Sequence, residues 1–349
     1  MLNEKKERLF YLDFIRALSV LSIVIFHFNA SLGSRSIGVI RIFFDTYANG
    51  NLGRIGVSLF FIISGAALMY TYKNDFIIKR YFKKRFSSIY PIFWTAYAIV
   101  LLYYFYKYYA LNPFSPQVPK WTFALSIIGM DGYLVALIPN YYMIGEWFLG
   151  CIILLYICFP FLRIFLVKYP KTLILCTLIV YFTVVQNYVF KIQIDYNILT
   201  RLPEFIFGMC FVLFVRKVNI YHFIISSLIL IFLFIIKIDI PYMYIITITG
   251  ISSFFVLAYI GQFISMEKIK KPFIIISKYS FAIFLVHHVI IEQVLERFTG
   301  RIITPIETYS LFLINCIILA IISFYLYKFS NHLSTFLKRY FSIAHSPTK

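Results

Sequence analysis

The stretch LDFIRALSVLSIVIFH at residues 12–27 decides the fold, because it places ionisable side chains in a segment otherwise apolar enough to cross a bilayer. Arg16 and His27 are eleven residues apart. A helix turns by about 100° and rises by about 1.5 Å per residue, so both groups lie on one stripe, about 16 Å apart. Asp13 is placed for an ion pair with Arg16. Intramembrane ionisable groups usually mark function; a snorkelling cation and a surface histidine are the structural alternative.

The composition excludes a soluble domain. Of the 349 residues, 61% are hydrophobic and 13% are charged, whereas about 25% are charged in soluble domains. Apolar runs long enough to span a bilayer lie at 10–29, 55–72, 89–109, 145–167, 172–190, 200–216, 221–237, 242–264, 273–291 and 308–329. The predicted fold class is therefore all-α, a polytopic integral membrane protein with about ten transmembrane helices. Residues 121–138, interrupted by Gly129, Asp131 and Gly132, are expected to form one re-entrant or interfacial segment.

The distribution of basic residues predicts the orientation. The formal net charge is +19, but the basic residues lie between apolar runs rather than on a soluble module, so no nucleic-acid partner is expected. With a cytoplasmic N-terminus, the basic turns fall inside by the positive-inside rule, at residues 73–85, 163–171, 216–217 and 268–271. We expect a multi-pass protein of the cell (plasma or inner) membrane with both termini cytoplasmic. Residues 1–335 are expected to form one transmembrane domain and 336–349 a cytoplasmic tail.

On this topology, polar residues gather at two depths. The outer side holds His27, Glu146, Arg201, His287 and His288, and Arg16 lies nearer the cytoplasm. This arrangement predicts a polar cavity with an outer reaction end and an inner cationic end. The structural alternatives are that Glu146 sits at the water boundary and that Arg201 forms a surface ion pair three residues along its helix.

His287 and His288 are adjacent, so we expect them to face different sides of their helix and at most one to point inward. A metal centre needs three or four converging ligands. His27, His287 and Glu146 are in principle such ligands, but the chain has no HxxxH or HExxH spacing. No metal is therefore expected.

Six motifs resemble, in order, those of the membrane-bound acyltransferase family 3. They are LDFIRALSVLSIVIFH at 12–27, GVSLFFIISG at 56–65, KKRFSSIYPIFW at 83–94, EWFLGCIILLYICFP at 146–160, RLPEFIFG at 201–208 and YSFAIFLVHH at 279–288. The resemblance implies transfer of an acyl group, usually acetyl from acetyl-CoA, to a hydroxyl of a polysaccharide or lipid-linked glycan. It implies no permanently bound cofactor, with acetyl-CoA as donor substrate and the lipid bilayer as surroundings.

The resemblance, together with the depth of each residue along its helix and its charge, also predicts roles for residues. His27 is the expected base or acyl acceptor, in a catalytic set with Arg16, Glu146 and His287. The anionic, cytoplasmic donor is expected to bind Lys84, Arg85 and Arg16, and the acceptor to bind Arg201 and Trp147. The sequence departs from the family at two positions. Ser88 stands where many members have a second arginine, and Ile152 stands where one subgroup has a glutamate.

A transporter or flippase of a glycan or other small substrate is the main alternative, since ten helices with buried Arg, His and Glu also describe a substrate path. Acyl transfer by the purified protein in detergent, where no gradient exists, separates the two. A purely structural membrane protein is the least expected function, because such a protein does not require polar groups at matched depths in the membrane.

Overall fold

The computed structural model describes residues 8–38, 41–44, 46–110 and 117–344, with side chains as far as Phe336. Its elements are α1 (Phe10–Ser34), β1 (Thr46–Tyr47), β2 (Gly50–Asn51), α2 (Leu52–Tyr72), α3 (Ile78–Tyr108), η1 (Lys120–Thr122), α4 (Phe123–Ile127), α5 (Asp131–Leu134), α6 (Glu146–Lys168), α7 (Pro170–Gln186), α8 (Ile198–Cys210), η2 (Phe211–Val215), α9 (Ile220–Ile235), α10 (Tyr242–Phe263), α11 (Glu267–Leu295), η3 (Glu296–Phe298) and α12 (Pro305–Ala344). The predicted all-α class is confirmed, because the short antiparallel pair β1–β2 is the one sheet in this described part.

Eight helices in the described residues are long and apolar enough to cross a membrane: α1, α2, α3, α6, α8 with η2, α10, α11 with η3, and α12. The helices α7 and α9 are apolar but shorter. Together these ten coincide with the ten apolar runs in the sequence. The segment at 121–138 forms the short helices η1, α4 and α5 in place of a spanning helix, and its re-entrant or interfacial position stays a prediction.

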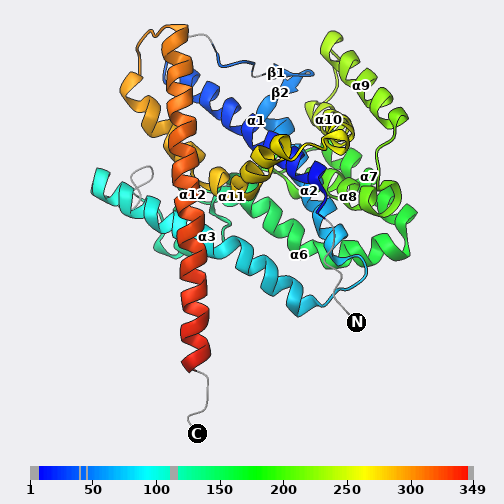
Figure 1. The fold of residues 1–349 in the computed structure, drawn as a ribbon, viewed down its shortest axis with the longest axis horizontal. Coiled ribbons are helices and arrows are strands. Elements are labelled where there is room, and N and C mark those ends of the chain that lie inside the picture. The colour runs from blue at the N-terminus through cyan, green and yellow to red at the C-terminus, as the bar shows by residue number, and fades with distance from the viewer. Residues whose placement is uncertain (1–7, 39–40, 45, 111–116, 345–349) are drawn as a thin grey trace.

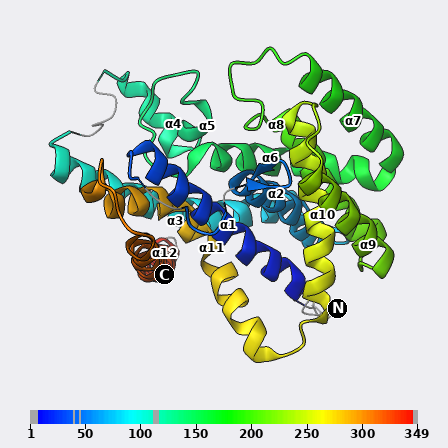
Figure 2. The same cartoon turned by 90° about the horizontal axis from the view of Figure 1, so that it is seen from above.

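Helix α1 lies in the middle of the assembly and packs against α2, α10 and α11 (Figures 1 and 2). Small residues bring the helices close to one another. A Cβ on Gly65 of α2 would lie 2.0 Å from the Phe205 carbonyl oxygen, and one on Gly208 of α8 would lie 1.9 Å from that of Ile62. Glycine at these positions allows the two backbones to touch, as small residues commonly do between transmembrane helices.

The long helix α12 runs past the other helices toward the C-terminus (Figure 1). Together with α3 and α11 it borders a groove of about 1350 Å³, lined mainly by apolar side chains. Its charged lining residues are Lys107, Glu296, Arg297 and Lys328. Helix α12 continues without a break through position 335, and the cytoplasmic location of residues 336–349 stays a prediction.

Candidate active site

Four ionisable side chains from three helices meet in one cluster. His27 comes from α1, Glu146 is the first residue of α6, and His287 and His288 lie late in α11. The Glu146 carboxylate lies between the rings, with Oε2 at 3.7 Å from His27 Nε2 and Oε1 at 3.2 Å from His287 Nε2 and 2.9 Å from His288 Nε2. The His27 ring centroid is 4.1 Å from that of His288 and 5.1 Å from that of His287. The predicted grouping of His27, Glu146 and His287 is therefore present.

The expectation that only one of the two adjacent histidines points inward is wrong. Neighbouring residues on a helix are separated by about 100°, but an imidazole ring reaches far enough for both Nε2 atoms to approach the same carboxylate oxygen. His287 is buried at 1% exposure, whereas His288 is 37% exposed. The Glu146 carboxylate lies between the directions in which the two side chains leave α11, so its Oε1 atom contacts both rings.

The start of α6 holds Glu146 in an unusual backbone conformation. Gly145 has φ +86°, and Glu146 itself has φ +43°, which is uncommon for a residue with a side chain. Such backbone strain is often found at functional sites. The Glu146 side chain is only 14% exposed, so it does not sit at an open water boundary as the structural alternative supposed.

The segment before α6 adds a second buried carboxyl near the cluster. Asp131 of α5 accepts a hydrogen bond from the backbone N–H of Gly132 at 2.9 Å. Burial raises the pKa of Asp131 to about 7. Asn140 donates to the Asp131 carbonyl oxygen at 3.0 Å, which connects α5 to the chain that leads into Glu146.

At the opposite end of the same stripe of α1, Arg16 belongs to a second polar group. Its Nη1 lies 3.8 Å from Asp13 Oδ1 and donates to the Ser277 hydroxyl of α11 at 3.4 Å. Ser277 in turn donates to Asp13 at 2.6 Å. Arg8, which precedes α1, donates to Asp13 Oδ2 at 2.5 Å, and this hydrogen bond raises the pKa of Arg8. The predicted Asp13–Arg16 pair is confirmed.

The basic residues of α3 lie against aromatic rings. The guanidinium carbon of Arg85 is 5.7 Å from the Tyr156 ring centroid, and Lys84 Nζ is 6.0 Å from that of Tyr72. The Nε of Arg85 is buried without a hydrogen-bond partner. Arg16 interacts electrostatically with both Arg85 and Tyr156. The predicted donor-binding cations therefore lie near one another.

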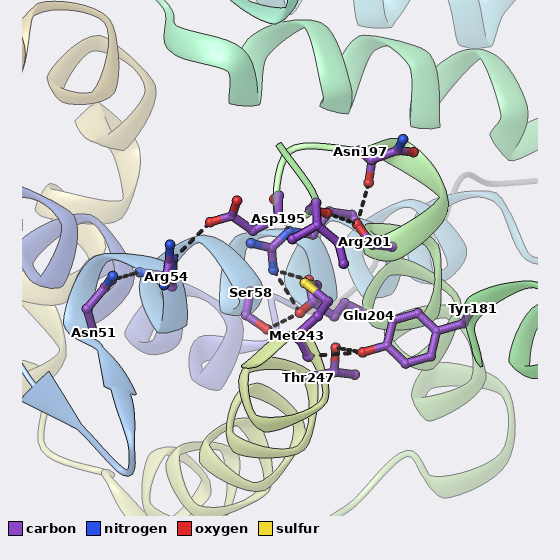
Figure 3. A network of polar contacts seen from close by, with 12 residues as sticks. Asn51, Arg54, Ser58, Tyr181, Asp195, Asn197, Arg201, Glu204, Met243 and Thr247 are labelled. Atoms are coloured by element: carbon purple, nitrogen blue, oxygen red, sulfur yellow. Dashed lines mark hydrogen bonds and ion pairs between the residues drawn. The ribbon is translucent and has the colours of Figure 1, made fainter. Parts of the chain in front are cut away.

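Arg201 and Glu204 form a fully buried ion pair, so the surface-pair alternative is wrong. Both side chains are 0% exposed, and Arg201 Nη1 lies 3.0 Å from Glu204 Oε1 (Figure 3). The same oxygen accepts a hydrogen bond from Ser58 of α2 at 2.6 Å, and Arg201 Nε donates to the Asp195 carbonyl at 2.7 Å. Close helix packing of α8 against α2 buries this pair, which residue spacing alone does not reveal.

The buried pair extends into a wider network that joins α2, α7, α8 and α10. Arg54 Nε lies 2.9 Å from Asp195 Oδ2, and the Tyr181 hydroxyl hydrogen-bonds Thr247 at 2.8 Å (Figure 3). Arg201 also lies 5.6 Å from the ring centroid of Trp147, next to Glu146. Trp147 stacks on Tyr196 at 4.3 Å. Arg201 therefore packs against the Trp147 ring. Binding of the acceptor by either residue stays a prediction.

A family model described as an acyltransferase domain matches residues 9–329. The chain belongs to this acyltransferase family. The resemblance carried by the six motifs is thereby confirmed, and the chain is an acyltransferase in a multi-pass membrane fold. No curated protein and no solved structure matches the chain.

Four of the six motifs of this acyltransferase lie on the helices that form the two polar groups, and the other two, on α2 and α8, surround the buried Arg201–Glu204 pair. Motifs on α1, α6 and α11 supply the histidine cluster, and those on α1 and α3 supply the cationic group. The transporter or flippase alternative has no such support. Sequence reasoning gave no site role to His288 or Ser277, both of α11. The signal for His288 was its position beside His287, but the packing of α11 against α1 decides which way each ring points.

Proposed function

We propose that the protein transfers an acyl group, most simply acetyl, from acyl-CoA to a hydroxyl of a cell-surface polysaccharide or lipid-linked glycan. The observation that carries the proposal is the placement of His27 beside the Glu146 carboxylate, on the same stripe of α1 as Arg16. This pairs a base with an orienting carboxylate at one depth and a cation at another. The family membership supports the acyl transfer itself.

The contact between His27 and Glu146 suits a general base. With Nε2–H directed at the Glu146 carboxylate, the His27 lone pair is on Nδ1, since each nitrogen sets the role of the other. The separation of 3.7 Å is long for a hydrogen bond, as catalytic contacts often are before substrate binds. Glu146 also stabilises the imidazolium that forms when Nδ1 takes a proton.

The reaction then runs as a direct transfer. His27 takes the proton from the acceptor hydroxyl while that oxygen attacks the thioester carbonyl carbon. The carbon–sulfur bond breaks, and the CoA sulfur leaves as a thiol after taking the proton from His27. In the covalent variant, His27 attacks the thioester first and passes the acyl group to the hydroxyl in a second step.

The cationic group suits the donor. The phosphates of CoA are separated from its thioester by a long flexible arm, and Arg16 lies about 16 Å from His27 along α1. Arg85 presents a buried Nε without a partner, and Lys84 lies beside it on α3. Guanidinium groups hold phosphate oxygens in a two-point contact.

The test is acyl transfer by the purified protein in detergent micelles, with acetyl-CoA and a fragment of the surface glycan as substrates. We expect the glycan to gain the mass of one acetyl group, detected by mass spectrometry, and free CoA to appear in equal amount. Neither product depends on a gradient. A folded protein that releases no CoA with any short acyl-CoA and any glycan acceptor overturns the proposal.

A further inference from the structure

Two lone pairs face one another inside the histidine cluster. His287 Nδ1 lies 2.7 Å from the carbonyl oxygen of Phe284, which only accepts hydrogen bonds, so Nδ1 carries the proton. The Nε2 lone pair therefore points at the Glu146 carboxylate, whose Oε1 is 3.2 Å away. Both atoms are buried, and neither makes a hydrogen bond of good geometry, although Oε1 also lies 2.9 Å from His288 Nε2. A buried acceptor facing another acceptor requires a cation between them, because each has lost its water without replacement.

We propose that His27, Glu146, His287 and His288 form a binding site for a divalent transition-metal ion of the zinc class. One ligand atom from each residue lies within 4.8 Å of the other three. Bonds of about 2.0 to 2.1 Å place the ligand atoms of a tetrahedral ion about 3.4 Å apart. The distances from the Glu146 oxygens to the three Nε2 atoms, 2.9, 3.2 and 3.7 Å, bracket this value.

The chemistry of the four ligands selects the ion. Three imidazoles and one carboxylate favour Zn²⁺, Co²⁺ or Ni²⁺ over Mg²⁺ or Ca²⁺, which prefer oxygen. The backbone contact of His287 is also typical of a metal ligand, since ligating histidines donate their other N–H to a carbonyl or carboxylate that fixes the ring. The partial exposure of His288 gives an ion a path to the cluster.

The site was not predicted from sequence spacing because its ligands come from three helices, with no two of them at a metal-binding interval. Its consequence for transfer rests on the proposed function. An ion held by His27 Nε2 and Glu146 replaces the hydrogen bond that directs the Nδ1 lone pair at the hydroxyl, and it prevents the ring from becoming an imidazolium. We therefore expect the metal-bound protein to be inactive in transfer.

Binding is tested with Co²⁺ as the probe, on the full chain purified in detergent with a tag that contains no histidine. The wild-type protein is expected to develop the visible absorption of tetrahedral Co²⁺, saturating at one ion per chain, and to lose it when Zn²⁺ is added. His287→Ala and Glu146→Gln are expected to weaken Co²⁺ binding by more than the roughly 10- to 100-fold that loss of an outer partner costs. Glu146→Gln keeps the size and polarity of the side chain, so it separates ligation from packing.

The matched controls are His332→Ala on α12, an exposed histidine, and His222→Ala on α9, a half-buried histidine, both outside the cluster. Both are expected to keep the wild-type Co²⁺ spectrum and affinity. Absence of the spectrum in folded wild-type protein overturns the metal site and assigns the cation between His287 and Glu146 to a proton. A spectrum that survives in His287→Ala and Glu146→Gln also overturns it.

Inhibition of acyl transfer by the bound metal ion is measured separately, on the same purified protein. Zn²⁺ is expected to stop acetyl transfer, and a chelator is expected to restore it. A wild-type protein that binds Co²⁺ through these residues but never transfers an acyl group contradicts only the proposed function. One that transfers acetyl but gives no Co²⁺ spectrum contradicts only the metal site.

Discussion

The Nε2 atom of His27 lies 3.7 Å from Oε2 of Glu146, which joins the outer part of α1 to the first residue of α6. Neither residue lies near the other in sequence. The contact depends on the positive φ angles of Gly145 and Glu146, which direct the carboxylate back toward α1 and α11. On this contact rests our proposal that Glu146 orients His27.

Glu146→Gln should lower the maximal rate of acyl transfer by up to about 10²- to 10⁴-fold, the range that a positioned base contributes. Glutamine keeps the side-chain size but removes the negative charge that stabilises the imidazolium. The rate is measured with saturating acetyl-CoA and glycan. The matched control is Glu267→Gln, an exposed residue that forms a surface ion pair with Lys270, and it should leave the rate unchanged. Equal rates for both variants contradict the orienting role.

Arg85→Lys should raise the acetyl-CoA concentration needed for half-maximal rate more than it lowers the maximal rate. A lysine supplies a point charge but not the two-point contact of a guanidinium with phosphate. His287→Ala should show the opposite pattern, with acceptor use impaired and donor affinity nearly unchanged. Donor affinity is measured by acyl-CoA binding to the purified variants.

The control for Arg85→Lys is Arg80→Lys on the same helix, whose exposed side chain pairs with Asp75. It should bind the donor as the wild type does. Loss of donor binding in His287→Ala, together with normal binding in Arg85→Ala, means that the two ends of the site are assigned the wrong way round.

Arg201→Ala or Glu204→Gln should destabilise the fold by about 3 to 5 kcal/mol, because removing one partner leaves the other charged and buried. The free energy of unfolding is measured in mixed micelles. The control pair is Lys270 and Glu267, where breaking the exposed contact should cost no more than about 1 kcal/mol. Wild-type stability in either buried variant contradicts the structural role of this pair.

The expected orientation places residues 79–85 in the cytoplasm and 140–145 outside. Single cysteines introduced into a chain with the five native cysteines replaced are treated with a membrane-impermeant thiol reagent on intact cells. Cysteines at 140–145 should react, and those at 79–85 should react only after the membrane is opened. Labelling near Arg85 from outside removes the basis for a cytoplasmic donor.

Much of the fold follows directly from the sequence, because each spanning helix is marked by consecutive apolar residues. The pairing of Asp13 with Arg16 could also be predicted from the sequence, because it depends only on helical spacing. The contact of His288 with Glu146 and the burial of Arg201 with Glu204 could not be predicted from the sequence. They depend on the packing of α11 against α1 and of α8 against α2, between segments far apart in sequence.

The proposed role of His27 in acyl transfer is tested most directly by the transfer rates of the His27→Ala and His27→Gln variants. Both variants are purified and compared with the wild type at equal protein concentration, after each is shown to be folded. Both variants should lose transfer by at least about 10²- to 10⁴-fold, and by more if His27 accepts the acyl group. They should still bind acyl-CoA, because Arg16 and Arg85 are intact. His27→Gln keeps a polar side chain of similar reach, so its inactivity excludes a packing defect. Glycan acylation at the wild-type rate in either variant contradicts the account.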